Sequence, residues 1–289
     1  MLTKEAHCLN NAPTNPKAIK TQLLQEISVK AQHWNAEILR REIRTGKWTG
    51  QTSGAASGYV QANMVMLPKE NAFEFLLFCN RNPKPCPVLD VLEPGRFTPN
   101  IAKDADVRSD LPKYSIYRHG TLDSEVSDVS DLFAEDTVTF LLGCSFSFEK
   151  ALMAANVPVR NIEEGNNVSM YITSRDCHKA GDFSSKLVVS MRPMTPGQAV
   201  RAVQITTRYH ITHGAPVHMG NPEQIGISDL AKPDFGDPVT INPGEIPVFW
   251  ACGVTSTLAA LSIKSPLVIT HSPGHMFVSD LPDEEMAIF

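Results

Sequence analysis

The sequence predicts a mixed fold of helices and strands, of class α/β or α+β, arranged in two domains. Runs with strand-like and helix-like spacing of apolar residues alternate loosely along the chain. The middle part has the order β-α-β-β-α-β, which is typical of a compact two-layer unit. The chain has 289 residues, of which 42% are hydrophobic, so it can bury one large core or two ordinary ones. We expect a three-layer α/β sandwich of residues 1–130 and 222–289, with a two-layer α+β domain of residues 131–221 inserted into it.

The N-terminal third begins with a helical pattern. Apolar residues recur near helical spacing from Lys17 to Arg44, and a stretch rich in Gly, Ser and Thr from Thr45 to Gly58 interrupts them. This stretch is either a mobile surface loop or a loop that covers a ligand. The elements expected after it are strand Val60–Leu67, helix Glu70–Asn80, strand Val88–Leu92, an irregular segment Glu93–Pro112 and strand Tyr114–Arg118.

The rest of the chain is more regular. The expected β-α-β-β-α-β unit consists of strand 137–142, helix 147–156, strand 168–173, strand 187–192, helix 196–208 and strand 215–219. A strand-like run at Val239–Ile241 and a strand at Leu267–His271 complete the C-terminal part.

Composition excludes several classes of protein. The formal net charge of −5 gives no general attraction to nucleic acid or anionic membranes. No apolar run approaches the roughly 18 to 20 residues of a membrane span, and the first residues lack a hydrophobic leader. The six cysteines show neither disulfide nor zinc-ligand spacing. We expect a soluble cytoplasmic protein with reduced cysteines and no metal site or cofactor, although a divalent metal is an open alternative; a homodimer is also possible.

Two distant stretches share one pattern, in which a buried strand runs into a turn of small and hydroxyl residues that opens a helix. The turns are Gly143–Glu149 and Ala251–Thr257. A helix N-terminus offers unpaired N–H groups and partial positive charge, so two of them facing one cleft would hold a small dianion such as a dicarboxylate. Alternatively, Ser145 or Ser147 caps one helix and Thr255 caps the other, with no ligand. The candidate binding residues of the turns are Ser145, Ser147, Cys252, Gly253 and Thr255.

Polar residues at strand ends are further candidates. Asn167 and Tyr171 flank an apolar strand, and Arg175 and Arg192 follow strands. Arginine forks bind carboxylates through two bonds at a time, so either arginine is a candidate carboxylate clamp. A solvated or salt-bridged arginine is the alternative.

Four histidines lie in two turns rich in Gly and Pro. They are His213 and His218 in one turn, and His271 and His275 in the other. A lone histidine is more often structural, but histidine also donates or accepts protons near neutral pH.

Several long motifs together resemble the D-glutamate cyclase family, whose bacterial members are labelled hydro-lyases. The resemblance covers nearly the whole chain from about Ala31 onward. The sequence departs from the family pattern around Asp176–Lys179 and Ser184–Lys186. The motifs are Gly58–Asn63, Phe75–Pro87, Gly143–Glu149, Val188–Pro193, His213–His218, Val248–Thr255 and His271–Phe277.

The resemblance implies an intramolecular dehydration of a small carboxylic acid. The amine of D-glutamate attacks its own side-chain carboxyl, water leaves, and 5-oxo-D-proline forms. This chemistry requires a base and an acid with separated pKa values. Candidates for those roles are Glu149, His213, His218 and His275, with His271 as a binding residue. Cys144 is a candidate nucleophile, against which a buried, inert thiol is the alternative.

Two other functions remain open at this point. One is a hydratase or dehydratase of another small carboxylic acid, assisted by a divalent metal, which a chelator would inactivate. The other is a non-catalytic carboxylate-binding protein, which a ligand would stabilise without turnover.

Overall fold

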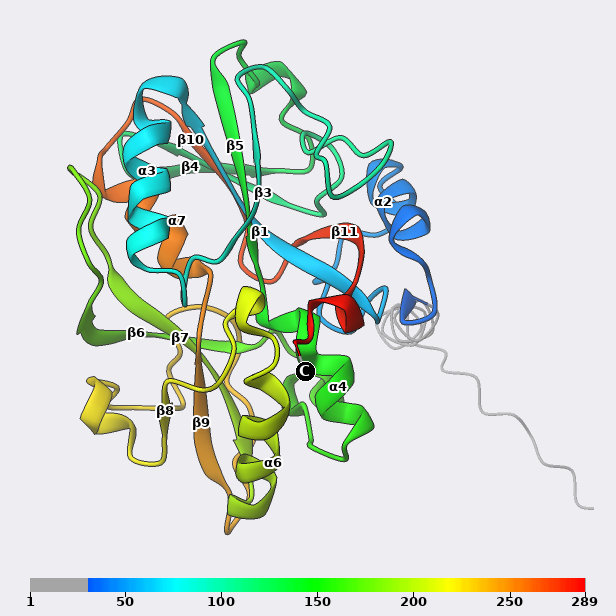
Figure 1. Cartoon of the computed structure of the whole chain (residues 1–289), viewed down its shortest axis with the longest axis vertical. Coiled ribbons are helices and arrows are strands. Elements are labelled where there is room, and N and C mark those ends of the chain that lie inside the picture. The colour runs from blue at the N-terminus through cyan, green and yellow to red at the C-terminus, as the bar shows by residue number, and fades with distance from the viewer. Residues whose placement is uncertain (1–30, 289) are drawn as a thin grey trace, which may run out of the picture.

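The computed structural model describes residues 31–288, which form two antiparallel sheets with helices packed against them (Figure 1). The larger sheet has seven strands in the order β2-β5-β1-β10-β3-β4, and β11 also pairs with β1. The smaller sheet has four strands in the order β6-β7-β9-β8. Every pairing is antiparallel, so the fold class is mixed α+β.

The larger sheet draws strands from both ends of the described chain. Its strands are β1 (Tyr59–Pro68), β2 (Val88–Leu92), β3 (Tyr114–Arg118), β4 (Thr121–Val126), β5 (Thr137–Gly143), β10 (Val268–His271) and β11 (Phe277–Pro282). The helices that pack near it are α2 (Ala36–Arg44), α3 (Lys69–Arg81) and α7 (Val254–Ser262).

The smaller sheet lies within the chain between β5 and α7. Its strands are β6 (Ser169–Asp176), β7 (Lys186–Met194), β8 (His218–Met219) and β9 (Ile246–Ala251). The neighbouring helices are α4 (Glu149–Ala154), α5 (Arg160–Glu164) and α6 (Pro196–Thr206). Short 3₁₀ turns are η1 (Ser130–Leu132), η2 (Ser145–Phe148), η3 (His210–Thr212), η4 (Pro222–Ile225) and η5 (Asp283–Met286).

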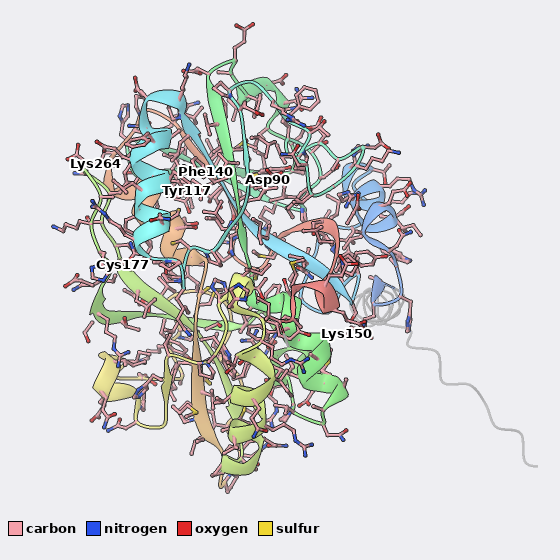
Figure 2. The ribbon with its side chains drawn as sticks, in the orientation of Figure 1. Asp90, Tyr117, Phe140, Lys150, Cys177 and Lys264 are labelled. Atoms are coloured by element: carbon pink, nitrogen blue, oxygen red, sulfur yellow. The ribbon has the colours of Figure 1, made fainter. Side chains whose placement is uncertain are left out.

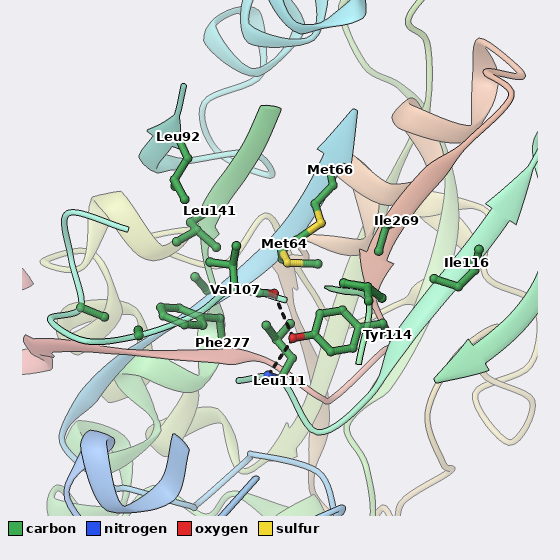
Figure 3. Packing of buried hydrophobic residues seen from close by; sticks show 14 residues of the cluster. Met64, Met66, Leu92, Val107, Leu111, Tyr114, Ile116, Leu141, Ile269 and Phe277 are labelled. Carbon is green, nitrogen blue, oxygen red and sulfur yellow. Dashed lines mark hydrogen bonds between the residues drawn. The ribbon is translucent and has the colours of Figure 1, made fainter. Parts of the chain in front are cut away.

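Both faces of the larger sheet are buried, which explains why β1 is apolar without alternation from Met64 to Leu67. Val65 and Leu67 point to the face covered by α3 and α7, where Phe140 and Tyr117 also lie (Figure 2). Met64 and Met66 point to the other face, where loop residues between β2 and β3 cover them (Figure 3). On that face the Tyr114 hydroxyl donates to the carbonyl of Val107 and accepts from the N–H of Leu111, which fixes the loop.

The smaller sheet also has two different faces. Val248 and Trp250 of β9 face α6 and α4, whereas Phe249 faces the opposite side together with Tyr171. Helix α6 begins with a capping box at Thr195 and has Pro196 in its first turn, which accounts for its sharp start.

The chain passes from one sheet to the other at the two turns singled out in the sequence. It leaves the larger sheet at the end of β5, and it returns through α7 after the end of β9. The turn residues therefore lie where the two sheets meet.

Several expected helices and strands are wrong in their length or in the strands with which they pair. The strand at 137–142 belongs to the larger sheet, so the β-α-β-β-α-β elements do not form one two-layer unit. The helix expected at 147–156 is a 3₁₀ turn followed by the six-residue α4, because Phe146 and Phe148 pack into different clusters.

The two other errors concern short strands. The strand expected at 215–219 has only two residues, because Pro216 has no N–H to donate to a partner. No strand forms at Val239–Ile241, where the N–H of Thr240 donates to the Glu164 carboxylate and its carbonyl accepts from Arg160.

The N-terminal helical pattern is also divided. Asn35 caps α2 through a bond from the Ile38 N–H to its side chain (2.8 Å), so the helix starts at Ala36. The part of the expected helix from Lys17 to residue 30 lies outside the described residues.

Candidate functional site

Asn63 of β1 joins the two turns. Its side-chain amide donates to the carbonyl of Gly143 (2.9 Å), at the end of β5. On its other side it packs against Gly253 so closely that a Cβ atom there would overlap the amide. The turns after β5 and β9 are therefore direct neighbours across one side chain. Gly253 is glycine because of this approach, since its backbone φ is in the ordinary range.

Each turn carries a buried thiol in an equivalent position. Cys144 and Cys252 belong to one apolar cluster with Val188 and Val254. The backbone N–H groups two residues ahead in the chain, those of Phe146 and Val254, act to lower the pKa of these thiols. Burial nevertheless raises the pKa of the Cys252 thiol to about 11, and it raises the pKa of Cys144 well above its ordinary value. Both thiols are therefore protonated at neutral pH, which disfavours Cys144 as a nucleophile.

The centre of the site is an ion pair between Arg192 and Glu149. Arg192 Nη2 donates to Glu149 Oε1 (2.7 Å), and the exposed fractions of the two side chains are 0% and 2%. Ser145 and Ser190 accept further bonds from the guanidinium (3.2 and 3.3 Å). The guanidinium also lies near the rings of Phe148 (5.7 Å) and Trp250 (5.5 Å). Arg192 Nε is buried and has no hydrogen-bond partner.

Glu149 is held on its other side by the loop before β1. Ser53 donates to Glu149 Oε2 (2.8 Å), and the Asn161 amide donates to the Ser53 hydroxyl (3.2 Å). Burial raises the pKa of Glu149, although the positive charge of Arg192 opposes this shift. A pocket with room for about one water molecule lies between this loop and Glu149. The Gly/Ser-rich loop therefore covers the carboxylate.

His213 is the candidate histidine that has a buried ring nitrogen without a partner among the described residues. Its Nδ1 donates to the carbonyl of Lys84 (2.8 Å), so Nε2 is a free acceptor, and that atom is buried without a partner. Burial lowers the pKa of His213 to about 4, and the charge of Arg192 contributes to this shift. The residue has a left-handed φ of 86°, which is rare outside glycine and often accompanies functional sites.

The chain has close relatives among known proteins. A protein of Geobacillus kaustophilus named "Putative hydro-lyase" is 58% identical over 250 residues, which cover 86% of this chain and 95% of that protein. A Bacillus subtilis protein of the same designation is 57% identical over 251 residues, covering 86% and 98%. A model of the family described as D-glutamate cyclase matches residues 138–280. This chain belongs to the D-glutamate cyclase family.

A solved structure of a nitrogen repressor-like protein from Methanococcus jannaschii covers 86% of this chain and 99% of that one. Its TM-score of 0.33 and identity of 8% are too low to inform the fold or the function.

The hydroxyls expected to cap the helices in this family member have other partners. Ser147 accepts from the N–H of Gln61 (3.0 Å), and Thr255 accepts from the N–H of Val188 (3.0 Å). Neither α4 nor α7 has a side-chain cap, so the capping alternative is wrong. These hydroxyls instead tie the turns to β1 and β7.

The other candidate histidines are held by backbone groups. The N–H of Met64 donates to His271 Nδ1 (3.2 Å), and His271 is buried with a pKa lowered to about 4. His275 Nδ1 donates to the carbonyl of Pro273 (3.0 Å), and burial lowers its pKa as well. His218 Nε2 donates to the carbonyl of Asn221 (2.7 Å). His271 thus joins β10 to β1, whereas His218 and His275 fix turns, and within residues 31–288 none of the three hydrogen-bonds to Glu149 or Arg192.

The remaining polar candidates lie apart from the ion pair. Tyr171 pairs with Val189, so it points to the opposite face of the smaller sheet from Arg192, and its hydroxyl donates to the carbonyl of Leu230 (2.7 Å). Arg175 is exposed and bonds the carbonyl of Val217 (3.5 Å). The amide of Asn167 donates to the carbonyl of Pro273 (3.1 Å) and packs on Gly274.

Sequence reasoning missed four polar side chains that build the site. The Gln61 amide donates to the carbonyls of Thr52 (2.9 Å) and Ala55 (3.3 Å) in the loop that covers Glu149. Gln61 and Asn63 interrupt an otherwise apolar strand, and this interruption was the signal that could have found them. Ser53 lies in the stretch Thr45–Gly58, for which a ligand-covering loop was one expectation, but nothing distinguished it within that stretch, and Asn161 gave no local signal. Within residues 31–288, no three His, Cys, Asp or Glu side chains are grouped to hold a metal ion. None of the helices in that range is long and apolar enough to cross a membrane.

Proposed function

We propose that this hydro-lyase converts D-glutamate to 5-oxo-D-proline and water at the junction of the two sheets. Membership of the D-glutamate cyclase family supports the reaction class and the substrate. The observation that supports this location is the fully buried Arg192–Glu149 pair, whose carboxyl has a raised pKa. Buried, perturbed groups of this kind concentrate at catalytic sites.

Two buried polar atoms, one on Arg192 of the pair and one on His213, have no partner within the described part of the protein. Arg192 Nε is a donor and His213 Nε2 is an acceptor, and both are buried without a partner. Such atoms are costly to leave unsatisfied. An amino acid carries both complementary groups, since its carboxylate accepts a bond and its amino group donates one. We infer that bound glutamate satisfies these two atoms.

The chemistry needs a group that moves protons from nitrogen to oxygen. Cyclisation forms a carbon–nitrogen bond and breaks a carbon–oxygen bond. The ammonium nitrogen loses two protons, and the departing carboxylate oxygen gains two to leave as water. A carboxyl of raised pKa can accept a proton from the nitrogen and return it to the oxygen, which is the role we assign to Glu149. Arg192 keeps Glu149 in place for both transfers.

His213 fits a binding role better than a proton-transfer role. With a pKa of about 4 it is neutral at pH 7, and it would hold a transferred proton poorly. Its Nε2 can still accept a hydrogen bond from the substrate nitrogen and orient the nitrogen lone pair toward the carboxyl carbon.

The test is to incubate the purified protein separately with D- and L-glutamate and to follow 5-oxoproline by chiral chromatography. The proposal expects 5-oxo-D-proline from the D enantiomer, with Glu149→Gln protein as the control for contaminating activity. A parallel incubation with small hydroxy acids, analysed for loss of water, covers other hydro-lyase substrates. Dehydration of a hydroxy acid without any cyclisation of glutamate would overturn the assignment.

A further inference from the structure

A second pocket has His213 in its lining. It has a volume of about 360 Å³, within the range of small-ligand sites. Pro83 and Lys84, in the loop after α3, form one wall. The other wall is formed by residues between Thr207 and Ala215, after α6. No acidic residue lines this pocket.

Lys84 contributes an unpaired positive charge to the pocket. Its Nζ lies 4.0 Å from the position that a Cβ atom of Gly214 would take, so the amino group lies near another residue of the pocket lining. The residue as a whole is exposed, yet partial burial of its side chain lowers the pKa of Lys84. No hydrogen bond or ion pair of the amino group exists among the described residues. A partly desolvated cation of this kind favours an anionic ligand.

The pocket is connected to the catalytic candidates through His213. The carbonyl of Lys84 accepts the bond from His213 Nδ1, so the loop that carries the cation also fixes the histidine tautomer. The charge of Lys84 and that of Arg192 both act on His213. Arg192 is already neutralised by Glu149, so a substrate with two carboxylates needs a further cation.

We propose that this pocket binds a carboxylate of the anionic substrate and that Lys84 provides the counter-charge. Lys84 is then a specificity-determining residue for dicarboxylic acids. The identity of the acid rests on the proposed function. Its negative charge is inferred independently, from the unpaired lysine and from the absence of acidic residues in the pocket lining.

The test uses glutarate, which has the two carboxylates of glutamate and no amine to react. Its binding to the full-length protein is measured by calorimetry for wild type, Lys84→Met and Lys84→Arg. Loss of one charge-assisted bond should weaken glutarate binding by roughly ten- to a hundredfold in Lys84→Met, and Lys84→Arg should restore most of it. Lys186→Met is the matched control, because it removes an equal charge from an exposed lysine paired with Asp176.

The outcomes separate this inference from the proposed function. Wild-type affinity in Lys84→Met, or no glutarate binding by the wild type, would overturn the role of Lys84. If glutarate binding depends on Lys84 but D-glutamate is not cyclised, the carboxylate site stands and the proposed reaction fails. If D-glutamate is cyclised and its KM is the same in Lys84→Met, the reaction stands and the inference fails.

Discussion

The carboxylate of Glu149 and the guanidinium of Arg192 meet inside the protein with no exposed surface to screen them. Taking two charges out of water is expensive, and their mutual attraction offsets that cost only when both are present. Removal of either charge leaves the other buried and uncompensated. The pair is therefore sensitive to substitution for a structural reason as well as a catalytic one.

The substitution Glu149→Gln separates the structural effect of the charge from its catalytic effect. Glutamine keeps the size of the side chain and can accept a bond from Arg192, but it cannot take up a proton. We expect turnover to fall by about 10² to 10⁴ while ligand affinity is nearly kept. Stability should fall by about 1 to 3 kcal/mol because the Arg192 charge loses its partner. Turnover and urea unfolding measure the two effects, and wild-type turnover in the folded variant would remove Glu149 from the mechanism.

The buried histidines make stability depend on pH. Burial lowers the pKa of His271 from its ordinary 6.5 to about 4. Below pH 6.5 the unfolded chain therefore binds a proton at His271, whereas the folded protein binds it only when the pH falls to about 4. The contribution of His271 to the free energy of unfolding is fully present above pH 6.5. It is lost as the pH falls toward 4, by about 3 kcal/mol in total.

His271→Gln tests this linkage. Urea unfolding of wild type and variant at pH 7.5 and pH 5 gives two differences in free energy, and the loss on acidification should be smaller in the variant. Comparison of the two proteins cancels the titration of Glu149, whose raised pKa acts in the opposite direction. An equal loss in both proteins would show that His271 is not linked to folding.

Individual site residues were predictable only where the signal was local. Glu149 could be named because it opens a helix after a distinctive turn, and Arg192 because it ends an apolar strand. Their contact spans 43 positions, and the contact of Ser53 with Glu149 spans 96, so both depend on how the sheets pack. The face to which Tyr171 points was not predictable, because it depends on the register between β6 and β7.

At the scale of elements, the close contact between the turn before α7 and β1 sets a strict size limit. A side chain at Gly253 would overlap the Asn63 amide, which also holds the end of β5. We expect Gly253→Ala to destabilise the protein by about 1 to 3 kcal/mol, as overpacked positions do.

Gly197 provides the matched control for that substitution. It lies in α6, has no atom within 4 Å of an added Cβ, and has an ordinary φ. Gly197→Ala should stabilise the protein slightly, by about 0.5 to 1 kcal/mol, because alanine favours a helix. Both changes are measured by urea unfolding, and equal effects of the two would contradict the steric argument.

Most element boundaries followed from the sequence, but sheet membership did not. The bounds of β2 and β3 agree with the expected ones, and those of α3, β1 and β5 differ by one or two residues. The spacing of apolar residues indicates which residues of a strand are buried, but it does not indicate which other strands that strand pairs with. The strand β5 therefore looked like the start of an inserted unit, although it pairs with β1 and β2 of the larger sheet.

At the scale of the whole molecule, the division into domains at residues 131 and 221 stays a proposal that fragments can test. Strand β9 lies outside that segment, yet it pairs with both β7 and β8. We expect a fragment of residues 131–221 to remain unfolded, because its sheet lacks a central strand. A fragment of residues 131–263, which contains β9 and α7, should have more structure by circular dichroism. Equal and cooperative unfolding of both fragments would support the predicted boundaries.

The passage of the chain between the sheets has a consequence for the order of folding. The residues that hold Glu149 come from separate parts of the chain, with 96 positions between Ser53 and Glu149 and 108 between Ser53 and Asn161. Contacts between such distant residues close large loops and form slowly. Enzymatic activity should therefore return after secondary structure during refolding, which makes catalysis a reporter of the last steps in assembly.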